Sequence, residues 1–483
     1  MRLTDLMTGI SGDIARPTPG EPDIAGLTAD SREVRPGYLF AALPGVKTDG
    51  SRFIKDALAA GAAALLTPPH AAPQLVPVIE SANPAQLLAR MAARFYAPQP
   101  GTLVAVTGTN GKTSVTVFAR QIWQRLNKCA ASLGTIGIIG NGIYRPGSLT
   151  TPDPVTLHRE LKALKMAGVD HVALEASSHG LDQFRLDGLT LAAAAFTNLT
   201  RDHLDYHRDM ERYFTAKARL FKELLPPGGG AILNIDGEAG RKLADIARAR
   251  GQRVMTYGIA DRAQARLLFA EALPSGQRLA IEVLGERRDF VLPLIGTFQA
   301  GNVLAALCLV LATGSEVGPA LDALPHLEGV PGRMQHVADH RDGAPVIVDY
   351  AHTPDALQTA LIALRPHCRG RLIVVFGCGG DRDAGKRPQM GEIAERLADR
   401  VFITDDNPRS ESPAAIRRAI LAACPKAQEI GDREAAIAEA LRTLGPQDLL
   451  LLAGKGHERG QILAHEVLPF DDAEVARRLA GVR

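Results

Sequence analysis

The segment TGTNGKTSV, residues 107–115, follows the apolar run LVAV and has the residue types of a phosphate-binding loop. Gly108 and Gly111 allow the backbone amides of the loop to turn toward phosphate oxygens. Lys112 would neutralise the β- and γ-phosphates of a nucleotide, and the hydroxyl of Thr113 would bind Mg²⁺. The first glycine of the standard pattern G-x-x-x-x-G-K-[ST] is a valine here. The loop therefore indicates ATP or GTP without indicating the reaction, and a chance glycine-rich turn is the alternative.

Polar side chains also follow two later apolar runs. HVALEASSHG places Glu175 at the end of the first run, and AAAFTNLTRDHLDYH places further polar groups after the second: Asn198, Asp202, His203, Asp205 and His207. Carboxylates and imidazoles at neighbouring strand ends of a nucleotide-binding sheet could hold a second Mg²⁺. A solvated loop whose side chains cap a helix is the alternative. Lys217 lies on a predicted helix whose apolar neighbours indicate partial burial, although a lone lysine there usually extends to the surface.

Short β-rich runs alternate with helical patterns along most of the chain. The runs predicted as strands are LVAVTG, HVALEA, AAAFTN, AILNID, PVIVDYA, LIVVFG, RVFITDD and DLLLLAG, and a helix is predicted from Thr113 to about Leu126. This alternation predicts an α/β fold with doubly wound parallel sheets, in which ligands bind at the carboxyl ends of strands. Connections containing proline and glycine at 96–101 and 327–333 divide the chain into three predicted domains. Their predicted bounds are 1–98, 99–330 and 331–483.

The composition excludes several classes of function. The chain of 483 residues has 55 Lys and Arg against 53 Asp and Glu, so a net charge of +2 gives no bulk attraction to nucleic acid or an anionic membrane. The N-terminal MRLTDLMTGI lacks the basic start and apolar core of a signal peptide, and the apolar stretches are too short to span a bilayer. We therefore expect a cytoplasmic protein. The five cysteines include no C-x-x-C pair, which argues against a disulfide framework and a zinc site.

Several of these segments occur together in one known family. TGTNGKTS, LEASSHGL, FTNLTRDHLDYH, the AK of TAKARLF, GRM, VDYAHTPDAL, FGCGGDRDAGKRP, DDNPR and AGKGHE stand in the order of the Mur ligases, and LTADSREVRPGYLFAAL resembles that family's N-terminal domain. The chain resembles the Mur ligases over nearly its whole length, and specifically those that add the third residue of the peptidoglycan stem peptide. The resemblance implies an N-terminal domain that binds the UDP-sugar, a central P-loop-type ATPase domain and a C-terminal Rossmann-like domain that binds the incoming amino acid.

The resemblance also implies a reaction. The γ-carboxyl of D-glutamate in UDP-N-acetylmuramoyl-L-alanyl-D-glutamate would be joined to an amine, while ATP gives ADP and phosphate through an acyl-phosphate intermediate. Peptidoglycan precursor synthesis of this kind supports cell wall biogenesis, cell shape and cell division. The implied cofactors are ATP and Mg²⁺, and we expect a monomer without nucleic-acid partners or membrane insertion.

The family's residues for ATP and metal fall on matching positions of this sequence. The implied ATP contacts are Gly108, Thr109, Asn110, Gly111, Lys112, Thr113, Ser114, Asn302, Arg333 and Asp349. The implied catalytic residues are Lys112, Glu175, His203 and Lys217. By resemblance, the metal ligands are Thr113, Glu175, His203 and Lys217 as a carbamate, because an unmodified ammonium would repel Mg²⁺. Gln299 stands where the family usually has asparagine, and its role is left open.

The two remaining substrates have their own matching positions. The implied contacts of the UDP-muramoyl-dipeptide are Ser31, Thr150, Thr151, Ser177, Gln183 and Arg185. Without the resemblance, Ser31 would be interpreted as a cap or turn residue, and the two threonines as residues preceding a proline-bounded helix. The implied contacts of meso-diaminopimelate are Arg387, Asp406, Asn407, Pro408, Arg409, Gly454 and Glu458.

Arg409 carries the prediction of the amino acid. Diaminopimelate has a carboxylate and an amine at its far end where lysine has only an amine. A guanidinium pairs with that carboxylate in bidentate fashion and repels a bare ammonium, and Glu458 would take the distal ammonium. A surface arginine after a turn proline is the alternative reading of Arg409. A lysine-adding ligase, a folylpolyglutamate synthetase and a switch that uses ATP without ligation are the alternative functions.

Overall fold

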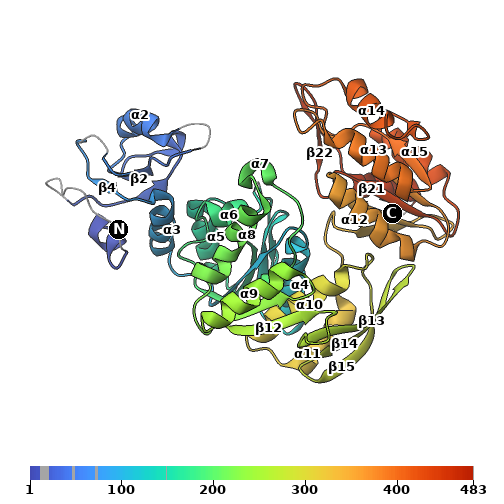
Figure 1. Ribbon diagram of the computed structural model, residues 1–483. Coiled ribbons are helices and arrows are strands. Elements are labelled where there is room, and N and C mark those ends of the chain that lie inside the picture. Colours follow the sequence, from blue (N-terminus) through green and yellow to red (C-terminus); the bar gives the residue numbers. More distant parts are fainter. Residues whose placement is uncertain (11–20, 46–48, 71–73, 148, 482–483) are drawn as a thin grey trace. The chain divides into compact units, whose positions relative to one another are not determined.

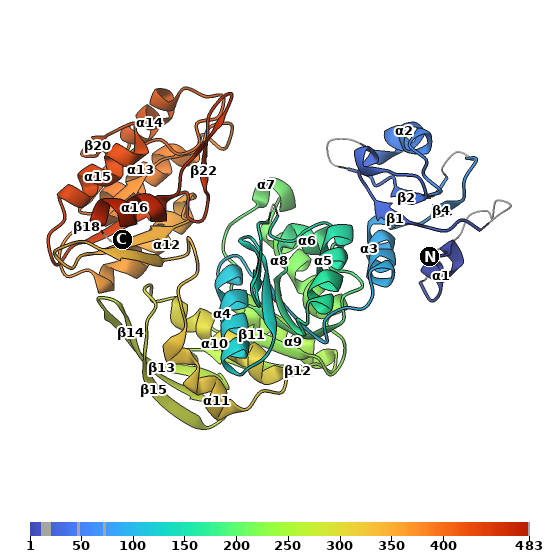
Figure 2. The same cartoon turned by 180° about the vertical axis from the view of Figure 1, so that it is seen from behind.

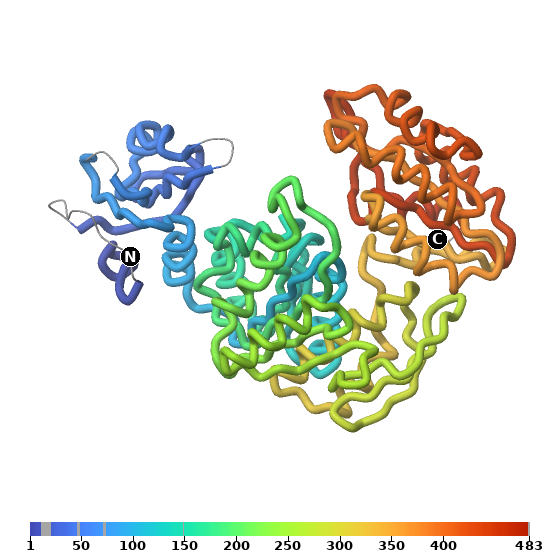
Figure 3. The backbone as a smooth tube through the Cα atoms, viewed as in Figure 1, coloured from blue at the N-terminus to red at the C-terminus, as the bar shows by residue number. Residues whose placement is uncertain are grey.

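The computed structural model of the protein describes residues 1–10, 21–45, 49–70, 74–147 and 149–481. The chain forms two compact units. The first comprises Met1–Thr256 and Cys308–Ser315, and the second comprises Tyr257–Leu307 and Glu316–Arg483. Figure 3 traces the chain from an N-terminal sheet through a central sheet to a C-terminal sheet. The predicted domain bounds at residues 98 and 330 remain a prediction.

The first unit begins with a small parallel sheet. Its strands are, in spatial order, β1 (Gly26–Thr28), β2 (Tyr38–Ala41), β3 (Ala64–Thr67) and β4 (Val78–Glu80). Its helices are α1 (Leu3–Met7), α2 (Ile54–Ala59) and α3 (Pro84–Phe95). Side chains alternate across the sheet, so Leu39 packs in one core with Leu87 of α3 while Phe40 packs in another with Ala57 of α2. The sheet is therefore covered on both faces.

The larger sheet of the first unit carries the phosphate loop. It is part of an 11-stranded sheet, whose strands from β11 onward are, in spatial order, β11 (Gly230–Asn234), β10 (Leu191–Phe196), β5 (Thr102–Thr107), β9 (His171–Glu175), β6 (Ala130–Gly134), β7 (Gly137–Gly140) and β8 (Ile143–Arg145). The strands from β11 to β6 are parallel, whereas β6, β7 and β8 are antiparallel. The carboxyl ends of β10, β5 and β9 therefore meet at one edge, where doubly wound sheets bind ligands.

Helices flank this sheet, as Figure 1 and Figure 2 show. They are α4 (Lys112–Arg125), α5 (Pro154–Met166), α6 (Ser178–Asp182), α7 (Leu204–His207), α8 (Met210–Arg219) and α9 (Glu238–Ala249). A π-helical turn over Leu220–Leu224 continues α8, and the strand β12 (Arg253–Gly258) follows α9. The strands predicted at LVAVTG, HVALEA, AAAFTN and AILNID are confirmed, and the helix predicted from Thr113 begins one residue earlier.

The second unit contains an antiparallel meander and a C-terminal sheet. The meander consists of β13 (Ala265–Leu273), β14 (Gly276–Val283) and β15 (Glu286–Leu292). The strands of the C-terminal sheet are, in spatial order, β16 (Gln335–Asp339), β17 (Pro345–Asp349), β21 (Leu449–Ala453), β18 (Leu372–Phe376), β19 (Arg400–Ile403) and β20 (Gln428–Glu429). All its pairings are parallel except that of β16 with β17. The four strands predicted in this region are confirmed.

The C-terminal sheet is buried on both faces. Its helices are α12 (Pro354–Leu364), α13 (Lys386–Leu397), α14 (Pro413–Leu421), α15 (Arg433–Arg442) and α16 (Asp472–Ala480). Residues of α12, α13 and α14 form one core with Ile347 and Leu451, whereas residues of α15 and α16 form another with Val348 and Leu450. The hairpin of β22 (Gly460–Ile462) and β23 (Val467–Pro469) precedes α16.

The helices α10 (Gln299–Ala312) and α11 (Val317–Asp322) follow the meander. The predicted α/β class is confirmed.

None of the helices in the described part of the chain has the length and apolar character needed to span a bilayer.

Candidate functional site

The phosphate loop joins β5 to α4 with an unusual backbone. Gly108 has a φ of +146° and Gly111 a φ of +88°, conformations that side chains other than glycine rarely adopt. A Cβ atom at Gly108 would also overlap the hydroxyl of Thr197. Lys112 begins α4, and its ammonium donates to the carbonyl oxygens of Gly108 (3.0 Å) and Thr109 (2.8 Å). The loop is thus a compact turn at a helix N-terminus, where backbone amides and the helix dipole favour an anion.

The end of the neighbouring strand β10 braces this loop. The backbone amide of Thr109 donates to the carbonyl oxygen of Asn198 (2.9 Å), and that of Asn110 donates to the Oδ1 of Asn198 (3.0 Å). The hydroxyl of Thr197 donates to the carbonyl oxygen of Asn110 (2.6 Å). Thr113 and Ser114 follow as buried residues in the first turn of α4. Thr197 was not identified from the sequence, although it lies in the predicted strand run AAAFTN.

Lys217 of α8 reaches the same loop from inside the unit. The side chain is only 1% exposed, and its Nζ donates to the carbonyl oxygen of Gly108 (2.8 Å). The Nζ also lies 4.3 Å from the ring centre of Tyr213. Burial, and then the positive charge of Lys112, lower the pKa of Lys217 well below its ordinary value. Lys217 is therefore buried more completely than the predicted partial burial. The alternative, a lysine that extends to the surface, is excluded, because the helix turns this side chain toward β5.

Glu175 ends β9, the strand on the other side of β5. The residue is 1% exposed, and its carboxylate accepts from the amide (2.8 Å) and the hydroxyl (3.2 Å) of Thr135. The carboxylate fits there because Gly134 has no side chain, since a Cβ atom at that position would overlap it. The carboxylate is therefore fixed at the predicted strand end. Thr135 was missed from the sequence, where it follows an apolar run without a recognisable motif.

His203 precedes the short helix α7 with a φ of +54°. Its ring centre lies 4.9 Å from that of His179 and 6.2 Å from that of Tyr213, and its Nε2 lies 3.4 Å from Asp202. Burial lowers the pKa of His203, and it lowers that of His179 to about 4. The lowered pKa values favour neutral imidazoles, the form that binds metals. His203 stands at the cap position of α7, but its side chain makes no capping hydrogen bond, and its role as a metal ligand stays a prediction.

The part of the chain that the structure describes contains no group of three or more His, Cys, Asp or Glu side chains that could hold a metal ion. Mg²⁺ at nucleotide sites usually takes one or two protein ligands and completes its shell with phosphate oxygens and water. The carboxylate of Glu175 beside a phosphate loop fits such a partial set. The residues therefore suit Mg²⁺ that is bound together with a nucleotide.

The residues predicted for the muramoyl-dipeptide form a single hydrogen-bond network, except Ser31. The hydroxyl of Thr151 donates to the carbonyl oxygen of Glu175 (2.8 Å) and accepts from the amide of Ser177 (3.0 Å). The guanidinium of Arg185 donates to the carbonyl oxygen of Thr151 (2.6 Å) and to the Oε1 of Gln183 (2.6 Å). Thr150 joins through the hydroxyl of Thr135 (3.0 Å). The network therefore connects directly to the strand end that carries Glu175.

Ser31 lies in the N-terminal sheet region instead. It begins a 3-10 turn over Ser31–Glu33, for which Asp30 is the cap. None of the hydrogen bonds found among the described residues links Ser31 to the network of Thr151. A turn position agrees with the structural alternative for this residue, and its contact with uridine stays a prediction.

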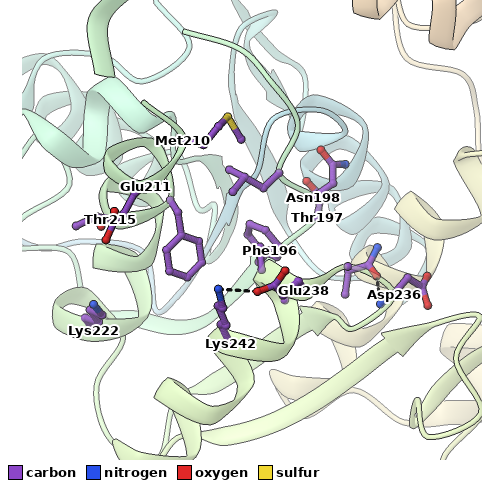
Figure 4. Close-up of a pocket in the computed structure, with 16 residues that line it drawn as sticks. Phe196, Thr197, Asn198, Met210, Glu211, Thr215, Lys222, Asp236, Glu238 and Lys242 are labelled. Atoms are coloured by element: carbon purple, nitrogen blue, oxygen red, sulfur yellow. Dashed lines mark hydrogen bonds and ion pairs between the residues drawn. The ribbon is translucent and has the colours of Figure 1, made fainter. Parts of the chain in front are cut away.

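A cavity of about 860 Å³ opens at the carboxyl ends of β10 and β11, with walls from α8 and α9. Figure 4 shows Asn198, Glu211 and Asp236 among its lining residues, and the ion pair of Lys242 with Glu238 (2.7 Å). Asn198 also braces the phosphate loop. The edge of the sheet is therefore hollowed beside that loop, where the topology favours a ligand.

The second unit holds the other residues predicted to contact ATP. Asn302, in α10, donates from its Nδ2 to the Oε1 of Gln299 (2.9 Å), which gives Gln299 a structural partner. Asp349, at the end of β17, accepts from the amides of Met334 (2.7 Å) and Ala351 (2.9 Å). Burial raises the pKa of Asp349, while the nearby charge of Arg333 opposes this rise.

Arg333 is held beside the same strand end. Its guanidinium carbon lies 4.7 Å from the ring centre of Tyr350. The backbone amide of Tyr350 donates to the carbonyl oxygen of Gly332 (2.9 Å), which brings the two segments together. Arg333 therefore lies near Asp349, and the contacts of both residues with ATP stay a prediction.

The loop after β19 contains the predicted selectivity residue Arg409. Its backbone has a φ of +52°, and its Nη1 donates to the carbonyl oxygen of Gly380 (2.8 Å). Pro408 is buried beside Gly380, where an added Cβ atom would overlap the proline carbonyl oxygen. Arg387, on α13, donates to Glu411 (2.9 Å) and to the carbonyl oxygen of Gly379 (3.3 Å). Both arginines thus approach the 379–380 turn, and an unconstrained surface arginine at 409 is excluded.

A second group of predicted residues meets around Asn407. The Nδ2 of Asn407 donates to the Oε2 of Glu458 (2.8 Å), and its Oδ1 accepts from the ammonium of Lys455 (3.0 Å). Asp406 and Gly454 adjoin them, since a Cβ atom at Gly454 would lie 3.4 Å from the Oδ2 of Asp406. The structure therefore gathers the predicted diaminopimelate residues in two neighbouring sets of one unit. Lys455 was missed, although it lies in the AGKGHE segment.

Comparisons with known proteins identify the family of the chain. The Mur ligase family, catalytic domain, matches residues 23–96, the Mur ligase middle domain matches residues 106–310, and the Mur ligase, glutamate ligase domain, matches residues 332–456. The chain is 53% identical over 486 residues to the UDP-N-acetylmuramoyl-L-alanyl-D-glutamate--2,6-diaminopimelate ligase of Bradyrhizobium diazoefficiens (strain JCM 10833 / BCRC 13528 / IAM 13628 / NBRC 14792 / USDA 110), and this match covers 100% of this chain and 99% of that one. It is 52% identical over 472 residues to the protein of the same name from Chelativorans sp. (strain BNC1), with coverage of 97% and 96%.

A solved structure of a UDP-N-acetylmuramoyl-L-alanyl-D-glutamate--2,6-diaminopimelate ligase is also similar. Its TM-score is 0.72 at 32% sequence identity, and the match covers 95% of each chain. Sequence and fold are therefore shared over nearly the whole length. The chain belongs to the Mur ligase family.

Proposed function

We propose that the protein is an ATP-dependent ligase that adds meso-diaminopimelate to the D-glutamate of UDP-N-acetylmuramoyl-L-alanyl-D-glutamate. The observation that carries this proposal is the identity of 53% over the full chain to a ligase named for these two substrates. The geometry supports it, because a phosphate loop lies in one unit and a D-N-P-R loop with two converging arginines lies in the other. The lysine-adding ligase and the folylpolyglutamate synthetase are not favoured by this similarity.

The reaction follows from the weakness of a carboxylate as an electrophile. The γ-carboxylate of D-glutamate attacks the γ-phosphorus of ATP, the bond to the β,γ-bridging oxygen breaks, and ADP leaves. The resulting acyl phosphate is attacked by the neutral amine of diaminopimelate, which loses a proton and expels phosphate. Lys112 stabilises the charge that develops on the phosphoryl oxygens. The dipeptide end is held by the network of Thr150, Thr151, Ser177, Gln183 and Arg185, and the uridine by Ser31.

Thr113, Glu175, His203 and a carbamate on Lys217 would hold Mg²⁺ in this account. Bound Mg²⁺ neutralises phosphate charge during phosphoryl transfer. Lys217 in its unmodified form places a second cationic side chain beside Lys112. Burial lowers the pKa of this amine, which favours its neutral form, the form that can add to CO₂. That step forms a C–N bond, releases one proton and turns the side chain into an anion suited to a cation.

Arg409 would select the amino acid by pairing with the distal carboxylate of diaminopimelate, while Glu458 takes the distal ammonium. Arg387, Asp406, Asn407, Pro408 and Gly454 complete that site. Asn302, Arg333 and Asp349 would bind ATP. We further propose that the protein acts as a monomer in the cytoplasm, where peptidoglycan precursors support cell shape and division.

This proposal is tested by measuring whether phosphate release from ATP depends on the amine substrate. Phosphate release is measured with ATP, Mg²⁺ and UDP-N-acetylmuramoyl-L-alanyl-D-glutamate, with and without meso-diaminopimelate. A ligase releases phosphate in step with added diaminopimelate. Equal phosphate release without the amine would identify an ATP-driven switch and contradict the proposal.

A further inference from the structure

Lys455 is buried without being part of any site assigned so far. It follows β21, its side chain is 0% exposed, and its Nζ lies 3.0 Å from the Oδ1 of Asn407. The Nζ also lies 3.5 Å from Asp406 and 3.6 Å from Glu458. Lysine is almost never fully buried unless it is paired. All three partners of Lys455 belong to the proposed diaminopimelate site, so its burial is tied to that site.

The backbone on both sides of Lys455 turns sharply. Gly454 has a φ of +113° and Gly456 a φ of +55°. A Cβ atom at Gly456 would come within 2.7 Å of the Cβ of Tyr350. Larger residues at these positions would strain the turn, so the glycines allow the chain to place a lysine inward at the strand end.

Lys455 decides how the amide of Asn407 is oriented. The Oδ1 of Asn407 accepts from Lys455 and from the backbone amide of Ile462 (3.0 Å). The Nδ2 of Asn407 then points at the Oε2 of Glu458 and donates to it (2.8 Å). With the amide reversed, its NH₂ group would face two donors. The ammonium of Lys455 and the backbone amide of Ile462 therefore fix the orientation in which Asn407 donates to Glu458.

The charge of Lys455 acts on the same residues. Its ammonium is within 4 Å of the carboxylates of both the buried Asp406 and the partly exposed Glu458, so removing it would leave two like charges without the cation beside them. The network continues to the selectivity loop, because the backbone amide of Arg409 donates to the carbonyl oxygen of Ile462 (3.0 Å). Glu458 and Arg409 are thus linked through the partners of Lys455.

We propose that Lys455 is a positioning residue that sets Asn407 and Glu458 for the distal amino-acid end of diaminopimelate. This inference rests on the proposed function and adds the residue that holds the ammonium-binding carboxylate in place. Lys455 itself does not touch the substrate in this account. It acts through the orientation of Asn407 and through the position of Glu458 between two fixed partners.

The test compares steady-state kinetics of the full chain and the variant Lys455→Met, which keeps the length of the side chain and removes its charge. The Michaelis constant (KM) for diaminopimelate should rise at least tenfold, while the KM for ATP stays within about twofold. Arg371→Met is the matched control, because Arg371 also pairs with a largely buried carboxylate, that of Asp448, at the opposite ends of β18 and β21. This control should lower the melting temperature and leave the KM for diaminopimelate unchanged.

A double-mutant cycle with Asn407→Ala separates positioning from general support of the fold. If Lys455 acts through Asn407, the double variant should raise the KM for diaminopimelate less than the product of the two single effects. Multiplicative effects, an unchanged KM in Lys455→Met, or an equal rise of the KM for ATP would overturn the inference. If Lys455→Met does not fold, Lys455→Gln is tested with the same expected split between the two KM values. Wild-type protein that makes no product with diaminopimelate would instead refute the proposed function.

Discussion

Lys217 shows how one residue can combine burial with a chemical role. Its ammonium shares the carbonyl oxygen of Gly108 with Lys112, so two cationic side chains converge on one backbone oxygen. Such an arrangement is unfavourable unless one of the amines is neutral or modified. The buried position of Lys217 beside Lys112 is therefore better explained by a neutral or modified amine than by packing alone.

The variant Lys217→Ala should lower turnover by at least about 10²-fold, as expected for the loss of an electrostatic contact to a transition state. Short-chain carboxylic acids such as acetate should restore part of this activity, because they can occupy the place of the carbamate. Phosphate release with and without acetate measures both effects. Full activity of the variant without any added acid would refute the role.

The second prediction about a single side chain concerns Arg409. The variant Arg409→Ala should raise the KM for diaminopimelate by roughly 30-fold or more, since a buried bidentate pair contributes about 2 kcal/mol or above. The KM for ATP should change little. Equal rises for both substrates, measured in the same assay, would show that Arg409 does not contact the amino acid.

Among the elements, the phosphate loop depends on the absence of a side chain. Gly108→Ala should raise the KM for ATP strongly, because the new methyl group would displace Thr197 and thereby the brace of the loop. Gly168→Ala is the matched control, since Gly168 also has a positive φ (+82°) but nothing lies within 4 Å of an added Cβ atom. Both variants should lose stability, by about 1 kcal/mol in the control. A similar KM for ATP in both variants would contradict this explanation.

The helix α5 contributes a pH-dependent term to stability through His158. This residue is buried, its Nε2 donates to the carbonyl oxygen of Asp187 (3.2 Å), and burial lowers its pKa to about 4 from an ordinary value of 6.5. The unfolded chain therefore takes up the proton first as the pH falls. The stabilisation is complete above pH 6.5 and is lost as the pH falls toward 4.

Denaturant unfolding of His158→Gln should reveal this term, because glutamine can donate to the same carbonyl oxygen without titrating. Between pH 7 and about pH 4.5 the wild type should lose roughly 2–3 kcal/mol more than the variant. Parallel pH profiles of the two proteins would show that His158 takes up no proton on unfolding.

The elements that position the site could be predicted from the sequence, whereas several contacts could not. Continuous apolar runs such as LVAV and LIVV predict buried parallel strands, and the glycines of the phosphate loop predict a turn before α4. Thr135 and Thr197 were missed because their roles depend on pairing between strands distant in sequence. The full burial of Lys217 could not be predicted either. The helical pattern predicts the side of the helix on which Lys217 lies, but not the segments that pack against that side.

For the whole molecule, the central claim is the choice of substrate by a chain that belongs to the Mur ligases. Its phosphate loop lies in the first compact unit, and its D-N-P-R loop lies in the second. The likeness to a named ligase covers 100% of this chain in sequence, and the likeness to a solved structure of a ligase with the same name covers 95% of it.

One measurement tests this claim most directly. The protein is incubated with ATP, Mg²⁺ and UDP-N-acetylmuramoyl-L-alanyl-D-glutamate, together with meso-diaminopimelate and L-lysine at equal concentration, and the product is weighed by mass spectrometry. We expect a single product that carries diaminopimelate. A product that carries lysine would contradict the role of Arg409, and the absence of both products would contradict the ligase itself.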